Sequence, residues 1–254
     1  DLVDGVLYSG EAARHLKRRA RPMPACWIGE EVATASLYES WVGNQWFGNW
    51  LLGDTLTYRL AEAAGSPVTT RLISSGHMAR DEALLGMRPR RLDRARFDEL
   101  ILFNDMPHNS HMAARARDFR ERVVGGRVHR AHPGVDLWRR SGRVQRSLAN
   151  EAALTEVLAW RHRFTILDPM AETVDEIAAA CAGARVVAGI EGSHLCHGMM
   201  VMPDDACLLV VQPPYRVVSF LKAITDYRGQ EFAFVVGNSG DIDIYAGGRS
   251  YGID

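Results

Sequence analysis

Residues 186–197 read VVAGIEGSHLCH, which combines a buried strand, a tight glycine turn and the start of a helix. In α/β proteins, ligands bind where the carboxyl end of a strand meets a helix N-terminus, because free amides and the helix dipole there favour phosphate. Gly189 and Gly192 let the backbone approach a ligand closely, and Ser193 can cap the helix or donate to a phosphate oxygen. From this motif alone, a phosphate-binding site and an ordinary strand-to-helix turn are equally good interpretations.

The rest of the chain alternates short apolar runs with amphipathic helices, which predicts an α/β fold with parallel sheets covered by helices on both faces. In the second half we expect strands at 135–139, 164–167, 185–188, 206–211 and 231–236, and helices that begin at Asn150, Thr173 and Val217. In the first half we expect strands at 25–28, 32–37, 68–73 and 100–103, helices at 46–64 and 110–124, and mainly loop at 80–96.

A stretch rich in helix breakers divides the chain. Gly125 and Gly126 end an arginine-rich helix, and the polar residues as far as Gly134 form a candidate linker. We therefore predict two Rossmann-like domains, 1–126 and 127–254, whose parallel sheets face a cleft. We assign no structure to the glycine-rich tail.

Arginines cluster just after the strand predicted at 135–139. Arginine forks match diphosphate oxygens in a bidentate way, whereas the alternative is a solvated basic loop. Parallel strands joined by right-handed crossovers would bring the loop after this strand and the loop after Ala188 to the same edge of the sheet. We therefore predict that both loops face one diphosphate ligand. The arginines are Arg139, Arg140, Arg143 and Arg146.

Residues 41–54 read WVGNQWFGNWLLGD and place aromatic and asparagine side chains at a helix start. Asparagine and tryptophan at a cleft rim suit sugar rings, so Asn44, Trp46 and Asn49 are candidates for an acceptor site. The alternative is that Trp46 and Trp50, four residues apart on a helix, pack in the core.

Bulk composition excludes several classes of function. The chain carries 30 basic and 31 acidic side chains, so its net charge gives no reason to expect a nucleic-acid partner. No apolar run approaches the roughly 18–20 residues of a membrane span, so we expect no integral membrane segment. The four cysteines form no CxxC pair, which favours a reducing compartment; we expect a cytoplasmic protein, with membrane association left open. His194 and His197 have no third ligand nearby in sequence, so we expect no metal.

Two stretches of the second half resemble glycosyltransferase family 61. The first is LWRR at 137–140, followed by the arginine-containing loop and by Asn150 and Glu151 at a helix start. The second is ARVVAG at 184–189, followed by the Glu-Gly-Ser turn and by MVMP at 200–203. The Glu-Gly-Ser-His form is similar to a bacterial branch related to capsular polysaccharide biosynthesis proteins. The likeness is good over 135–215 and weaker before it, where it depends on 44–54 and 98–104.

The resemblance implies a GT-B fold and an inverting transfer of a sugar from a nucleotide-diphosphate donor to a glycan or lipid-linked saccharide acceptor. The donor would bind mainly to the second domain, and the acceptor to the first. In such enzymes a base deprotonates the acceptor hydroxyl, while arginines and helix amides stabilise the departing diphosphate without a bound metal. We therefore expect no cofactor.

One position departs from the family pattern. Many members have a histidine just before a Trp/Phe-Leu-Leu run, where this chain has Asn49, and asparagine cannot act as a base. His194, Asp54, Glu191 and His77 are candidate substitutes; His194 and Asp54 are preferred, because Glu191 is better suited to orienting the turn or accepting from ribose hydroxyls. A catalytically inactive relative that binds a nucleotide sugar or a glycan is the alternative. No G-x-G-x-x-G follows a strand, which disfavours a dinucleotide-dependent oxidoreductase.

Overall fold

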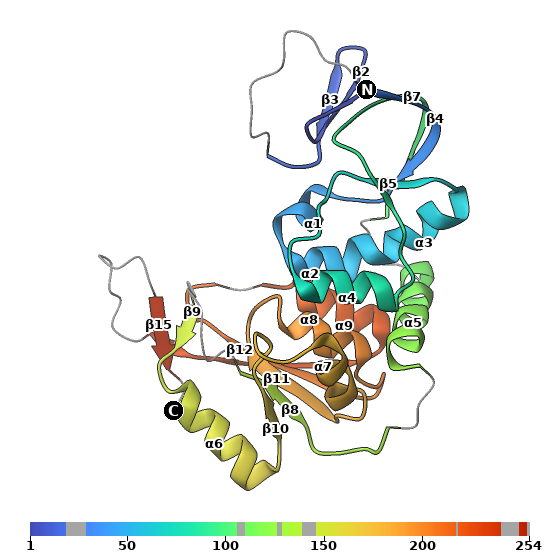
Figure 1. Ribbon diagram of the computed structural model, residues 1–254. Helices are drawn as coiled ribbons and strands as arrows, with labels where there is room; N and C mark the ends of the chain where they lie inside the picture. Colours follow the sequence, from blue (N-terminus) through green and yellow to red (C-terminus); the bar gives the residue numbers. More distant parts are fainter. Residues whose placement is uncertain are drawn as a thin grey trace. The chain divides into compact units, whose positions relative to one another are not determined.

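The structure is a computed structural model, and it describes residues 1–18, 29–105, 110–125, 129–138, 146–216, 218–239 and 249–252. The chain forms two compact units, Asp1–Pro107 and His108–Asp254 (Figure 1). The seven-stranded sheet belongs to the first unit, and the five-stranded and three-stranded sheets belong to the second.

The first unit contains a seven-stranded sheet in the order β3-β2-β1-β7-β4-β5-β6. Strands β7, β4, β5 and β6 are parallel, as predicted, whereas β1, β2 and β3 add an antiparallel extension that the sequence analysis missed. Alternating strand and helix produce the parallel part, and tight turns such as that at Gly10 produce the extension. The strands are β1 (Leu2–Val3), β2 (Val6–Ser9), β3 (Ala12–His15), β4 (Glu30–Leu37), β5 (Pro67–Thr69), β6 (Arg90–Arg91) and β7 (Arg94–Leu102).

Helices follow β4 and β5. The helix predicted at 46–64 is confirmed, but it begins with a short turn and includes a π-helical segment; the elements are α1 (Trp41–Gln45), α2 (Phe47–Asn49), η1 (Trp50–Asp54) and α3 (Thr55–Ala64). Gly65 ends α3 with a positive φ of 93°. The loop predicted at 80–96 is wrong, because α4 (Gly76–Leu84) reaches into it, as do β6 and β7. Ser75 starts α4 by accepting a hydrogen bond from the Met78 amide (3.2 Å).

The second unit contains a five-stranded sheet in which every neighbouring pair is parallel, as predicted. The strand order is β10-β8-β11-β12-β13. The strands are β8 (Val135–Leu137), β10 (Thr165–Leu167), β11 (Val186–Ile190), β12 (Cys207–Gln212) and β13 (Glu231–Val236). The buried residues of β8, β11 and β12 form the centre of the sheet.

Helices cover both faces of this sheet (Figure 1). One face carries α6 (Glu151–His162), which Thr155 ties to β8 by a hydrogen bond to Asp136 (3.1 Å). On the other face, Gly198 of α8 contacts Val187 and Leu137, and α7 packs beside α8. The elements on that side are α7 (Val174–Cys181), α8 (Leu195–Val201) and α9 (Phe220–Arg228). The predicted capping box of α7 is present, with Thr173 and Glu176 bonding reciprocally.

Helix α5 (Ser110–Val124) has the predicted bounds but packs on α7, α8 and α9. Its Arg120 donates to the carbonyls of Val201 (2.9 Å) and Ala182 (3.3 Å), which are C-terminal helix carbonyls without helical partners. The units therefore divide between Pro107 and His108, before α5, whereas the sequence analysis placed the boundary after it, at 126/127.

A small sheet completes the second unit. It consists of β14 (Asn238–Ser239), β15 (Arg249–Gly252) and β9 (Arg146–Leu148), in the order β14-β15-β9. The tail, to which the sequence assigned no structure, thus pairs with a strand about a hundred residues earlier. Among the described residues of either unit, no helix combines the length and apolar character needed to cross a bilayer.

Candidate functional site

The strand order of the second unit locates its ligand-binding edge. Numbered by appearance in the unit, the strands run 2-1-3-4-5, so the direction of sheet growth reverses between β8 and β11. Ligands of open α/β sheets bind outside the carboxyl ends of the strands at this reversal. The two loops that the sequence singled out, after β8 and after β11, both leave the sheet at this point.

The arginine-rich segment starts and ends beside this edge. Arg139, Arg140 and Arg143 lie outside the described residues, as does the side chain of Arg146. The segment leaves from the end of β8, where the Trp138 amide donates to the Leu167 carbonyl (2.8 Å). It returns as β9, whose Leu148 packs against Ile190 of β11 and Val211 of β12. Trp138 and Leu148, the described residues on either side of the segment, therefore both lie near the carboxyl ends of strands of this sheet.

The turn after β11 offers backbone donors. The Glu191 amide still bonds to β12 through the Val211 carbonyl (3.0 Å), and the chain then turns at Gly192 and Ser193 into α8. The carbonyls of Gly192 and Ser193 accept from the first residues of α8, but their own amides have no acceptor among the described residues. Unpaired amides at the start of a helix are the groups that bind anions in α/β proteins.

A buried acid lies at the same turn. Glu191 is 5% exposed, and its Oε2 is 4.0 Å from Nε of Arg216, which is half-exposed. Ile190 and Val211 are register partners, so Glu191 and the buried Gln212 follow them side by side on β11 and β12. Sequence reasoning missed Gln212 and Arg216. The signal was their place at the carboxyl end of β12, the strand next to β11: Gln212 is its last residue, and Arg216 lies in the loop that follows.

Gly189 and His194 pack against one another rather than facing open space. A Cβ on Gly189 would lie 2.9 Å from Cδ2 of Leu195, 3.1 Å from the Leu137 carbonyl and 3.5 Å from Nε2 of His194. Close packing of α8 on the sheet therefore explains the glycine without a ligand. His194 is half-buried at the N-cap of α8, whereas His197 is buried inside the helix.

The first unit has a polar edge at the carboxyl ends of β4 and β5. The buried Glu39 accepts hydrogen bonds from Oγ1 of Thr69 (2.5 Å), from the Thr70 amide (2.8 Å) and from Oγ1 of Thr70 (2.7 Å). Arg71 donates to the Gly43 carbonyl and lies over the Trp50 ring at 5.7 Å. Glu39 and Arg71 thus hold the loops after β4 and β5 together.

Asp54 is part of this edge but lies beneath its surface. It is 2% exposed, and its Oδ1 accepts from the Ser40 amide (3.1 Å) and hydroxyl (2.7 Å). Ser40 in turn caps α1 by accepting from the Gly43 amide (3.0 Å). Burial raises the pKa of Asp54 to about 8, more than the bonds from Ser40 and the charge of Arg71 lower it. An acid so placed anchors the start of α1 and has no open path to a sugar hydroxyl.

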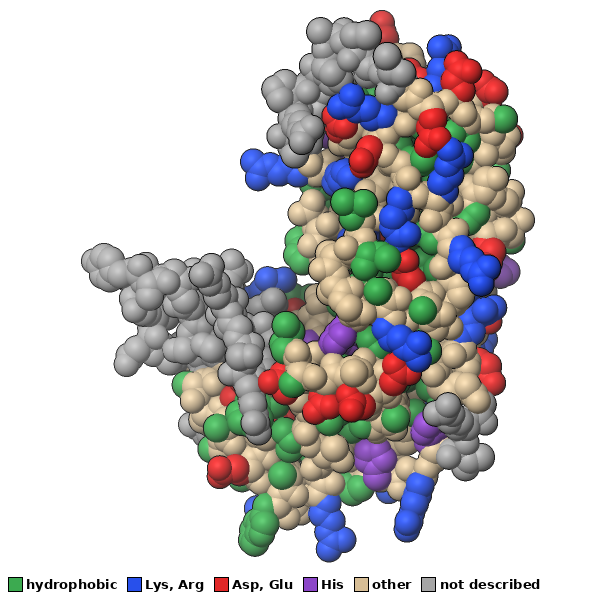
Figure 2. Space-filling model, in the orientation of Figure 1, with side chains coloured by type: hydrophobic (Ala, Val, Ile, Leu, Met, Phe, Trp, Pro, Cys, Tyr) green, Lys and Arg blue, Asp and Glu red, His purple; other side chains and the backbone are tan. Residues whose placement is uncertain are grey.

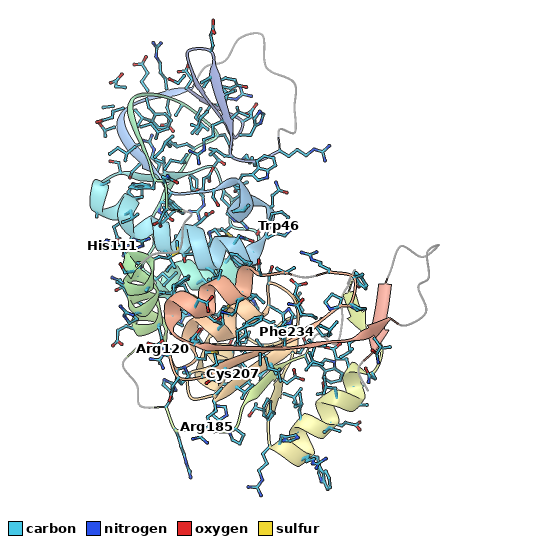
Figure 3. The ribbon with its side chains drawn as sticks, turned by 180° about the vertical axis from the view of Figure 1, so that it is seen from behind. Trp46, His111, Arg120, Arg185, Cys207 and Phe234 are labelled. Atoms are coloured by element: carbon cyan, nitrogen blue, oxygen red, sulfur yellow. The ribbon has the colours of Figure 1, made fainter. Side chains whose placement is uncertain are left out.

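The aromatic and asparagine-rich segment divides between surface and core. Trp50 is 1% exposed, which confirms the core alternative for that side chain, whereas Trp46, labelled in Figure 3, is 53% exposed. Asn44 donates to the Leu16 carbonyl (2.9 Å), and Asn49 is half-buried in α2. Of the three acceptor candidates, Trp46 presents the largest open surface.

The family model described as Glycosyltransferase 61 matches residues 24–209. The chain belongs to glycosyltransferase family 61. The resemblance stated from the two C-terminal stretches is thereby confirmed, and the match extends through most of the first unit. No curated protein matches the chain.

Among the described residues, this edge presents the free amides of Gly192 and Ser193 and the buried acid Glu191. Peptide amides and guanidinium groups stabilise a departing phosphate, and a buried carboxylate can accept from hydroxyl groups. Three or more histidine, cysteine or acidic side chains that could hold a metal do not converge anywhere within the described ranges.

Proposed function

We propose that this glycosyltransferase moves a sugar, with inversion, from a nucleotide-diphosphate donor to a glycan or lipid-linked saccharide acceptor in surface or capsular polysaccharide synthesis. The observation that carries the proposal is that the loops after β8 and β11 leave the sheet at the reversal between these two strands. One loop has unpaired amides at Gly192 and Ser193, and the other contains the arginines at 139–146. Together they supply the charge that a diphosphate requires without a metal ion.

In this proposal the second unit binds the donor and the first unit binds the acceptor, as in a GT-B enzyme whose two sheets face a cleft. The amides of the turn after β11 and the arginines neutralise the leaving diphosphate, and Glu191 accepts from the ribose hydroxyls. Trp46 stacks on an acceptor sugar, with Asn44 and Asn49 beside it.

The family pattern does not identify the catalytic base of this chain, because Asn49 stands where many members have a histidine. Of the four candidates, Asp54 is buried beneath α1 and Glu191 is engaged with Arg216. His77 lies in α4 of the first unit, whereas the proposed donor loops belong to the second. His194 is half-buried beside the proposed diphosphate site, with Nε2 buried next to Gly189, and it is less enclosed than either of the two acids. We assign the proton transfer to His194.

Arg139→Ala and Arg143→Ala are each expected to weaken nucleoside-diphosphate binding by about 1–3 kcal/mol, the scale of a hydrogen bond to a charged group. This corresponds to roughly 5- to 150-fold in Kd, measurable by calorimetry once a thermal-shift screen of nucleotide sugars has found the donor. Arg117→Ala, an exposed arginine of α5, is the matched control and is expected to bind normally. Unchanged affinity in both test variants would remove the arginines from the donor site. Tight donor binding without turnover would favour the inactive binding relative.

A further inference from the structure

Exposed arginines gather at the edge of the second unit's sheet that lies opposite the proposed donor site, where its strands begin. Arg163 and Arg185 each lie two residues before a residue that pairs with Val135, so they flank the start of β8. With strands about 4.8 Å apart, the Cα atoms of Thr165 and Val187 are roughly 10 Å from each other, and each arginine lies two residues before one of them. Arg130 is next to them, because a Cβ on Gly183 would overlap its carbonyl. All three are exposed, and none forms an ion pair with a described residue.

An exposed aromatic side chain lies three residues before Arg163. Trp160, in the last turn of α6, is 88% exposed, and the exposed Val157 lies one turn before it. Arg161 is also exposed and without an ionic partner among the described residues. At the bottom of Figure 2, blue side chains and a green one project from the surface. A tryptophan so exposed on a folded helix is unusual, because tryptophans are on average highly buried.

Charge separates along this edge although the whole chain is nearly neutral. The arginines precede β8, β10 and β11, whereas Asp204 and Asp205 precede β12 and Glu231 is the first residue of β13. Asp204 is already paired with Arg228 (2.6 Å). The helix dipole of α6 accounts for a cation at Arg161, but it gives no reason for Arg130 or Arg185.

The backbone at Arg163 adds a second reason to suspect a function. Arg163 ends α6 in the left-handed region, with φ 58° and ψ 38°, where glycine is strongly preferred. Arg163 thus adopts a backbone conformation that costs free energy for a residue with a Cβ.

We propose that this surface, defined by Arg130, Val157, Trp160, Arg161, Arg163 and Arg185 and called the basic edge, binds an anionic phospholipid bilayer. Arginines pair with lipid phosphates, and a tryptophan inserts at the headgroup level, where one end of the ring is apolar and the other polar. A nucleic acid fits less well, because one tryptophan offers no row of stacking platforms. The proposal goes beyond sugar transfer, since the donor site lies at the other edge of the sheet and does not require it.

Sedimentation with vesicles tests the basic edge. The full chain is expected to sediment with phosphatidylcholine vesicles that contain phosphatidylglycerol, and to stay in solution with phosphatidylcholine alone or at high salt. Each arginine at a bilayer surface contributes about fivefold to partitioning, so Arg161→Gln with Arg185→Gln is expected to lower it about 25-fold. Arg117→Gln with Arg122→Gln makes the same charge change on α5 and is expected to leave partitioning unaltered. Equal losses in the two double variants would overturn the proposal.

Two further variants separate binding from folding. Arg163→Gly is expected to lower partitioning about fivefold while the melting temperature stays the same or rises, because glycine suits the left-handed position. Trp160→Ala is expected to lower partitioning and to abolish a blue shift of fluorescence that anionic vesicles produce in the parent chain. Full partitioning of either variant, or capture by a nucleic acid in preference to vesicles, would contradict a bilayer site. Donor affinity is measured separately and is expected to be normal in all of these variants, so failure of the donor site would be distinguishable.

Discussion

Asp54→Asn is expected to raise the free energy of unfolding at pH 8 by several kcal/mol. The parent carboxyl has a pKa of about 8 in the folded unit, against 3.8 as its ordinary value, because burial disfavours its charged form. Between these two values the folded state holds a proton that the unfolded state has released, so stability falls as pH rises through this window. Each unit of difference between the two pKa values corresponds to about 1.4 kcal/mol. Asparagine keeps an oxygen for Ser40 and does not ionise.

Chemical denaturation at a series of pH values measures this effect. The parent is expected to lose stability from about pH 4 to about pH 8, and Asp54→Asn to lose much less. Asp98→Asn, which alters an exposed carboxylate of β7, is the matched control and is expected to follow the parent. Identical pH dependence in the parent and in Asp54→Asn would show that the Asp54 carboxyl is not desolvated.

The same variant distinguishes an anchoring role from a catalytic one. Because Asp54 faces Ser40 beneath α1, Asp54→Asn is expected to keep sugar transfer, whereas His194→Asn is expected to lose it with donor affinity retained. Loss of transfer in Asp54→Asn with a stable fold would return Asp54 to the role of base.

Gly43→Ala is expected to destabilise the first unit by about 1–3 kcal/mol, the usual cost of overpacking. A Cβ at this position would overlap the Asp54 carboxylate, with Oδ1 only 2.6 Å away. The carboxylate cannot move aside easily, because Ser40 holds it by two hydrogen bonds and the site is buried. The free energy of unfolding from denaturant titration measures the loss.

A double variant identifies the cause of that loss. With Asp54→Ala the obstructing carboxylate is gone, so Gly43→Ala is expected to cost much less in that background. Gly53→Ala is the matched control, because a Cβ on Gly53 meets nothing within 4 Å. If Gly43→Ala were equally harmful with and without Asp54, the contact between the two residues would not be its cause.

Strong local signals made much of the second unit predictable. The capping box at Thr173, the apolar run of β13 and the periodicity of α5 each fix an element over a few residues, and the structure places them where expected. The same holds for β11 and its turn, although the strand extends to Ile190.

Elements that depend on distant partners escaped sequence reasoning. Strand β15 pairs with β9, which lies about a hundred residues earlier in the chain. The four residues of β15 contain no sequence signal that predicts this pairing. The unit boundary was misplaced because Gly125 and Gly126 look like a linker, whereas Arg120 ties the helix before them to α7 and α8. The burial of Asp54 and its bonds to Ser40 could not be read from a segment that looks like a sugar-binding rim. The proximity of Glu191 and Arg216 required the register of β11 with β12.

The central claim is that a nucleoside diphosphate binds at the reversal between β8 and β11. Hydrogen–deuterium exchange of the full chain, with and without the nucleoside diphosphate that binds in a thermal-shift screen, tests this directly. We expect slower exchange in peptides that cover 138–148 and 191–196, and unchanged exchange at the basic edge. Protection centred on 38–54 or on the basic edge, with none at those two loops, would contradict the account.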